Sequence, residues 1–160
     1  MHKGFEPSFF DKLFDDQPMG AARRRLSLEQ LKDSVARDLE ALLNTRVLID
    51  AAVAESFPMT TRSVVGFGLS DFAGLSLANV HHRRNICVSI ESAIAAHEPR
   101  LRDVRVDLEL HRKTVNALYF SINAVLVVRP AQEPVSFDAL LTPTSLQYSV
   151  SRKRRPAVAS

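Results

Sequence analysis

The sequence contains only one cysteine, Cys87, and it lacks any long run of apolar residues. A single cysteine excludes a disulfide or a cluster of thiolate ligands within the chain. No window has the unbroken apolar length that a membrane span requires, and the residues after Met1 show neither the apolar run nor the cleavage pattern of a secretory signal. We therefore expect a cytoplasmic protein with no direct membrane insertion. The 160 residues, 46% of them hydrophobic and 24% charged, suit one globular domain.

The net charge of +3 is concentrated near the ends of the chain. Arg152, Lys153, Arg154 and Arg155 together carry more positive charge than the whole chain, and Arg23 to Arg25 form a second basic cluster. The body between them is mildly acidic, which argues against a broad face for nucleic acid. We expect residues 152–160 to form a basic flexible tail.

Residues 1–20 predict an N-terminal arm with one short amphipathic helix. Four apolar residues fall on one side of this helix and two prolines bound it; they are Phe9, Phe10, Leu13, Phe14, Pro7 and Pro18. Such a segment is too short to fold alone. It either covers part of the core or anchors another subunit.

Two longer helices are better defined. Ser27 can cap the first, and Gln30 completes a capping box, so this helix is expected to run to about Asn44. The second follows Asn79 and stops near Glu98, because the proline after it forces the chain out of helical geometry. Its apolar face is expected to contain Val80, Ile86, Cys87, Ile90 and Ile94.

The segment between these helices is irregular in pattern. Residues 46–61 fit either an irregular helix or a connection. Gly66, Gly68 and Gly74 indicate a turn, and their spacing matches no phosphate-binding fingerprint.

The C-terminal half predicts strands. Apolar and polar residues alternate over 104–110 and 118–128, and shorter strands are expected at 135–141 and 146–150 around the turn from Thr142 to Ser145. The sequence thus predicts an α+β fold, with two or three N-terminal helices packed on one face of a roughly four-stranded antiparallel sheet.

Four segments, in order, resemble one known family. They are Phe67-Gly68-Leu69-Ser70-Asp71, Gly74-Leu75-Ser76-Leu77, Glu98-Pro99-Arg100-Leu101 and Val104-Arg105-Val106. In this combination the chain resembles TssE, a baseplate subunit of type VI secretion systems related to the lysozyme-like wedge protein of contractile-tail phages. Residues 21–151 would form the TssE-like domain. The sequence departs from the family at Phe67, Ser70 and His97, where a tyrosine, a proline and an aromatic residue are usual.

The resemblance implies a structural wedge component that docks the contractile sheath onto the baseplate. Its copies would stand in a ring at the inner face of the cytoplasmic membrane. The implied partners are the wedge subunits TssF, TssG and TssK and the sheath proteins TssB and TssC. Strand edges rich in Val, Leu and Ile can accept the backbone of another chain, which fits pairing with sheath strands.

Glu98, Pro99, Arg100 and Leu101 are the candidate partner-binding residues. Pro99 holds the chain near extended geometry, so Glu98 and Arg100 project to the same side as an acid and base pair. The resemblance implies contacts from this pair to a neighbouring subunit. The alternative is a local salt bridge that only ends a helix.

Three other functions are weaker. A peptidoglycan-degrading muramidase needs two carboxylates, one of them protonated, but Arg100 favours the ionised form of Glu98 and no second carboxylate stands out, so no catalysis is expected. Metal binding is not expected, because His81 and His82 are adjacent whereas the two histidines of a zinc motif on a helix are four positions apart. His97 and His111 do not complete such a motif. No cofactor is expected. A small nucleic-acid-binding protein, using residues 81–84 and the tail, is the second alternative.

Overall fold

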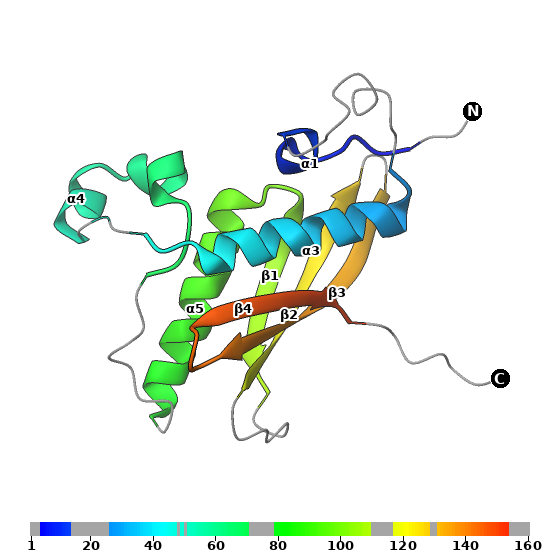
Figure 1. Cartoon of the computed structure of the whole chain (residues 1–160). Coiled ribbons are helices and arrows are strands. Elements are labelled where there is room, and N and C mark those ends of the chain that lie inside the picture. Colours follow the sequence, from blue (N-terminus) through cyan, green and yellow to red (C-terminus); the bar gives the residue numbers. More distant parts are fainter. Residues whose placement is uncertain are drawn as a thin grey trace.

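Helices α3 and α5 lie against a four-stranded sheet in the computed structural model of the chain (Figure 1). The structure describes residues 4–13, 26–47, 49, 51–70, 79–109, 117–128 and 131–153. The features expected at Phe14, Pro18, Arg23 to Arg25, residues 71–78, Leu110, His111, Arg154 and Arg155 lie outside these residues.

The helices begin where the sequence predicts. α3 (Leu28–Asn44) starts after Ser27, whose hydroxyl accepts the Gln30 N–H while the Gln30 side chain accepts the Ser27 N–H, which confirms the capping box. α5 (Val80–His97) starts after Asn79, whose side chain accepts the His81 N–H. Its buried residues are Ile86, Cys87, Ile90 and Ile94. Val80 is 65% exposed, so its expected place on the buried face was wrong; it lies in the first turn, ahead of the buried positions.

Short helices occupy parts of the remaining N-terminal half that the structure describes. α1 (Phe9–Leu13) forms in the arm, and α4 (Ala51–Ser56) is followed by two 3-10 turns, η1 (Thr60–Arg62) and η2 (Val64–Gly66). The region from 46 to 61 therefore contains irregular helix. None of the helices in the described part of the chain is long and apolar enough to cross a membrane.

The four strands are β1 (Leu101–Leu108), β2 (Leu118–Val128), β3 (Ala131–Thr142) and β4 (Gln147–Arg152). They form one sheet in the order β1-β2-β3-β4, and every neighbouring pair is antiparallel. The α+β prediction is confirmed. Leu146 belongs to the turn with φ 54°, so β4 begins one residue later than expected and continues to Arg152.

The core lies between the sheet and the two long helices. Phe120, Ile122 and Leu126 of β2 and Phe137 of β3 are at most 1% exposed. They meet the buried faces of α3 and α5, including Leu39 and Ile90, in one cluster. This cluster fixes the ends of α3 and α5 relative to the sheet edges, and with them the residues described next.

Candidate functional site

The expected site residues lie at the corner between α5 and β1, and we call Glu98, Pro99 and Arg100 the corner. The Glu98 N–H still bonds the Ile94 carbonyl at 2.8 Å, and the Leu101 N–H bonds the Glu98 carbonyl at 3.1 Å, so the chain changes direction within three residues. Arg100 Nε donates to Glu98 Oε1 at 2.7 Å, and a terminal nitrogen of Arg100 also bonds the Glu98 carboxylate. The predicted acid and base pair is therefore formed within the chain.

The four predicted site residues differ in their exposure to solvent. Glu98 is 5% exposed and Leu101 is 4% exposed and part of the core, whereas Pro99 is exposed. The Arg100 side chain is 25% exposed. From outside, another molecule can reach Pro99 and Arg100 but hardly Glu98.

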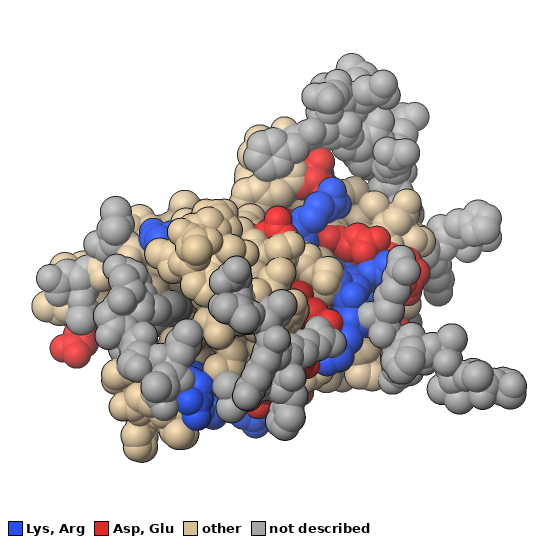
Figure 2. All heavy atoms as spheres, turned by 60° about the horizontal axis from the view of Figure 1, so that its bottom comes forward, with Lys and Arg blue, Asp and Glu red and all other residues tan. Residues whose placement is uncertain are grey.

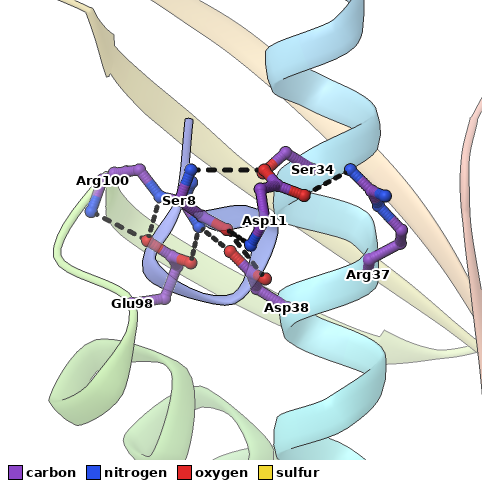
Figure 3. Close-up of polar contacts among 7 residues, drawn as sticks. All are labelled: Ser8, Asp11, Ser34, Arg37, Asp38, Glu98 and Arg100. Atoms are coloured by element: carbon purple, nitrogen blue, oxygen red, sulfur yellow. Dashed lines mark hydrogen bonds and ion pairs between the residues drawn. The ribbon is translucent and has the colours of Figure 1, made fainter. Parts of the chain in front are cut away.

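Asp38 of α3 is a member of this site that sequence reasoning missed. A terminal nitrogen of Arg100 donates to Asp38 Oδ2, 62 positions away in the chain (Figure 3). Asp38 belongs to an amphipathic helix, and such a pattern carries no signal for the partner of a polar residue. One guanidinium thus connects the corner to α3.

The N-terminal arm joins the same network. The Ser8 hydroxyl donates to Asp38 Oδ1 at 3.4 Å, and Asp11 accepts from the Ser34 hydroxyl at 2.5 Å and from Arg37 at 2.6 Å (Figure 3). Phe5 and Leu26 exchange two backbone hydrogen bonds of 2.8 and 2.7 Å. The arm therefore covers part of the domain through polar contacts.

The two aspartates of the network differ electrostatically. Burial raises the pKa of Asp38, and the Glu98 charge adds to that shift, while the contacts with Arg100 only partly offset it. Burial also acts to raise the pKa of Asp11, but the hydrogen bonds from Ser34 and Ser8 and the Arg37 charge outweigh it, so this pKa is lowered. The ionised form is therefore favoured at Asp11 and disfavoured at Asp38.

His97, where the sequence departs from the TssE pattern, makes both an aromatic contact and a polar contact. Its ring meets Phe67 edge-on at a centroid distance of 5.4 Å, and Nε2 lies 2.9 Å from the Gly66 carbonyl oxygen. The ring centroid of Phe10 in α1 lies 6.3 Å from that of Phe67. These rings, with Leu42 and the corner, line an open groove of about 300 Å³.

The two sheet edges, which the resemblance marks for strand pairing, carry side-chain contacts. At the β4 edge, Asn44 bonds both the N–H and the C=O of Tyr148 at 2.8 Å, and Glu40 accepts the Val150 N–H at 2.8 Å. At the β1 edge, Glu91 of α5 accepts the Val106 N–H at 2.9 Å. These backbone groups are therefore occupied in the isolated chain.

Basic residues near the C-terminal end of β4 are paired with acids. Arg152 contacts Glu29 and lies 2.6 Å from Asp33, and Lys153 lies 2.9 Å from Glu109. On the face that Figure 2 displays, Lys and Arg lie beside Asp and Glu. Arg152 and Lys153, expected at the start of the tail, are thus held against the domain. Within the described ranges no group of three His, Cys, Asp or Glu residues could hold a metal ion.

The family model described as "Baseplate wedge protein gp25" matches residues 29–131, which include all of α3 but Leu28, together with α5, the corner, β1 and β2. Among curated proteins, none matches the chain. Because the match spans more than half of the chain and contains the network that links α3 to the corner, this chain belongs to the family of the baseplate wedge protein gp25, which is also the family of TssE.

Proposed function

We propose that this protein is a non-catalytic wedge subunit in the baseplate of a type VI secretion system, where it docks the contractile sheath. The observation that carries the proposal is the family match over residues 29–131, which contains the corner. TssF, TssG and TssK are the proposed wedge neighbours, and TssB and TssC are the proposed sheath partners. Copies stand in the ring of the baseplate, in the cytoplasm at the inner face of the cytoplasmic membrane.

The corner supports the proposal through the exposure of its residues. Arg100 lies at the groove with a quarter of its side chain exposed, beside the exposed Pro99. Glu98 and Asp38 hold the guanidinium in one orientation, which lowers the entropy lost when it binds an acidic group of a neighbour. In this proposal Arg100 makes the contact, and Glu98 positions it.

The same contacts argue for a structural role over glycoside hydrolysis. A muramidase needs one carboxyl group free to protonate the leaving oxygen and a second that faces the sugar. Glu98 and Asp38 instead share one guanidinium, and Glu98 is 5% exposed. Neither carboxylate is placed to meet a glycan.

Affinity capture from the native host with chemical crosslinking tests the proposal. We expect recovery of the wedge proteins and the sheath, with crosslinks near the corner, and weaker recovery with Arg100→Lys, which keeps the charge but loses the planar fork. Arg84→Lys, on the exposed surface of α5, is the matched control. Recovery of neither assembly, or clearing of a peptidoglycan suspension by the pure protein that Glu98→Gln abolishes, would overturn it.

A further inference from the structure

Side chains of α3 bond the backbone of the β4 edge, and these bonds can keep a strand-pairing subunit unpaired before assembly. An edge strand presents backbone N–H and C=O groups that can pair with any extended chain. In β4 the backbone groups of Tyr148, Val150 and Arg152 point outward, because those of the alternate residues face β3, as does the Lys153 N–H, which bonds the Ser136 carbonyl at 2.9 Å. Side chains of α3 bond the N–H and C=O of Tyr148 and the N–H of Val150.

These side chains reproduce the contacts of a neighbouring strand. The Asn44 amide donates to the Tyr148 carbonyl and accepts its N–H, as the C=O and N–H of one residue in an antiparallel partner strand would. Glu40, one helical turn earlier, accepts from Val150. Four residues of helix rise about 6 Å and two residues of strand about 6.7 Å, so this pair of side chains matches the repeat of the strand edge.

The β1 edge differs in kind. Its register shifts between Arg102 and Arg105, and Asp103 has φ 52°, so a bulge interrupts the edge itself. A bulge changes the backbone and prevents regular pairing. At the β4 edge the strand itself is regular and the cover consists of side chains of α3, so it can be displaced without a change in the β4 backbone.

We infer that Asn44 and Glu40 keep the β4 edge closed in the free subunit and are displaced when an extended strand of a partner pairs with that edge. This contact is autoinhibitory. It rests on the proposed function only for the identity of the partner, because the cover itself belongs to the isolated chain. The arriving strand must replace three hydrogen bonds before it gains any, which disfavours pairing with chance partners.

Amide hydrogen exchange of the purified full chain, followed residue by residue, tests the cover. Glu40→Ala should speed exchange of the Val150 amide roughly tenfold, the loss expected for one hydrogen bond to a charged group. The Ser149 and Ser151 amides, which face β3, should keep their rates. Glu40→Gln retains an acceptor oxygen and should change the Val150 rate less. Glu29→Ala is the matched control, since Glu29 lies on the same helix and contacts the Arg152 side chain, not the β4 backbone.

An unchanged Val150 rate in Glu40→Ala overturns the inference, whatever the protein's partners are. If Glu40→Ala unfolds the chain, exchange of all β4 amides becomes faster together. In that case the exchange rate of the Tyr148 amide is measured in Asn44→Ala instead, and an unchanged rate there overturns the inference. In the capture experiment, Glu40→Ala should recover at least as much sheath as the wild type, because the edge is easier to open. Reduced sheath recovery from a folded Glu40→Ala protein would show that Glu40 binds the partner, and would overturn the displacement. Failure of capture by the wild type would reject the proposed partner and leave the exchange result standing.

Discussion

At the scale of single residues, the Arg100 side chain joins parts of the chain that are distant in sequence. It binds Glu98 at the end of α5 and Asp38 in the middle of α3. Both carboxylates are largely buried, with side-chain exposures of 6% and 12%. Burial acts to lower the pKa of Arg100, but its bonds and charge interactions with Glu98 and Asp38 raise it, so the guanidinium stays charged at every pH at which the protein folds.

We predict that Arg100→Ala lowers the free energy of unfolding by about 3 kcal/mol, because it leaves two buried carboxylates without a counter-charge. Urea denaturation should show a lower midpoint at an unchanged slope. Arg37→Ala is the control: this arginine also pairs with an aspartate, but its side chain is 69% exposed and its loss should cost less than about 1 kcal/mol. Equal losses in the two variants would contradict a structural role for Arg100. The milder Arg100→Lys is therefore the better variant for capture experiments.

Asp38 and Asp11 should respond to pH in opposite senses. The pKa of Asp11 in the folded state lies below 3.8, so its contribution to stability is present above that pH and is lost as the pH falls through the lowered value. The pKa of Asp38 lies above 3.8, so the folded state binds this proton more tightly and gains stability as the pH falls through the raised value. On acidification Asp38 protonates first and Asp11 later.

Carboxyl carbon NMR measures both titrations. The Asp11 midpoint should return toward 3.8 in a Ser34→Ala, Arg37→Ala protein, because both groups favour its ionised form. The Asp38 midpoint, set first by burial, should move little in that protein. An Asp11 midpoint above that of Asp38 in the wild type would refute the ordering.

The site could be predicted from sequence only where it is local. Glu98 and Arg100 are two residues apart around a proline, so backbone geometry alone brings them together. Asp38 and Ser8 reach the same cluster from other elements, and an amphipathic pattern shows which side of a helix is polar but not which charge lies opposite it. His97 was read as a departure from the family pattern, yet its edge-on contact with Phe67 preserves the aromatic packing.

At the scale of elements, the difference between local and long-range interactions also explains which helix and strand boundaries could be predicted from the sequence. The start of α3 and the end of α5 are fixed by capping and proline chemistry, which is local, and both were predicted. The start of β1 was missed by three residues. Leu101 and Val106 are both buried although five positions separate them, because the bulge at Asp103 reverses the alternation. The alternation of apolar and polar residues that marks a strand is therefore visible only in the part of β1 that follows the bulge.

Gly68 connects the end of α3 to the segment that precedes α5. Its φ of 129° is strained for residues with a side chain, and a Cβ there would lie 2.5 Å from the Thr45 carbonyl oxygen. That oxygen accepts the Leu69 N–H at 2.8 Å. We predict that Gly68→Ala lowers the free energy of unfolding by about 2 kcal/mol, measured by urea denaturation. The exposed Ser70→Ala should be nearly neutral. A neutral Gly68→Ala would mean that this link between α3 and the loop adds nothing to stability.

At the scale of the whole molecule, the arm is docked by polar side chains together with Phe5 and Phe10. Ser8 and Asp11 face α3, whereas Phe9 and Leu13 are 72% and 60% exposed. A helix that only covered a core would bury its apolar residues. Phe5 packs against the core, so part of the arm covers it. That the arm also anchors another subunit, through the exposed Phe9 and Leu13, stays a prediction.

The double variant Phe9→Ser, Leu13→Ser separates these roles. Because both side chains are already mostly exposed, the free energy of unfolding should change by less than about 0.5 kcal/mol. Recovery of baseplate partners in affinity capture should nevertheless fall, since the variant removes the apolar surface that an anchor would bury. Phe5→Ser is the matched control with the reverse expectation: it lowers stability, because Phe5 packs against the core. If Phe9→Ser, Leu13→Ser recovers as much wedge protein as the wild type, the arm serves only its own domain, and the exposed side of α1 is not a contact surface.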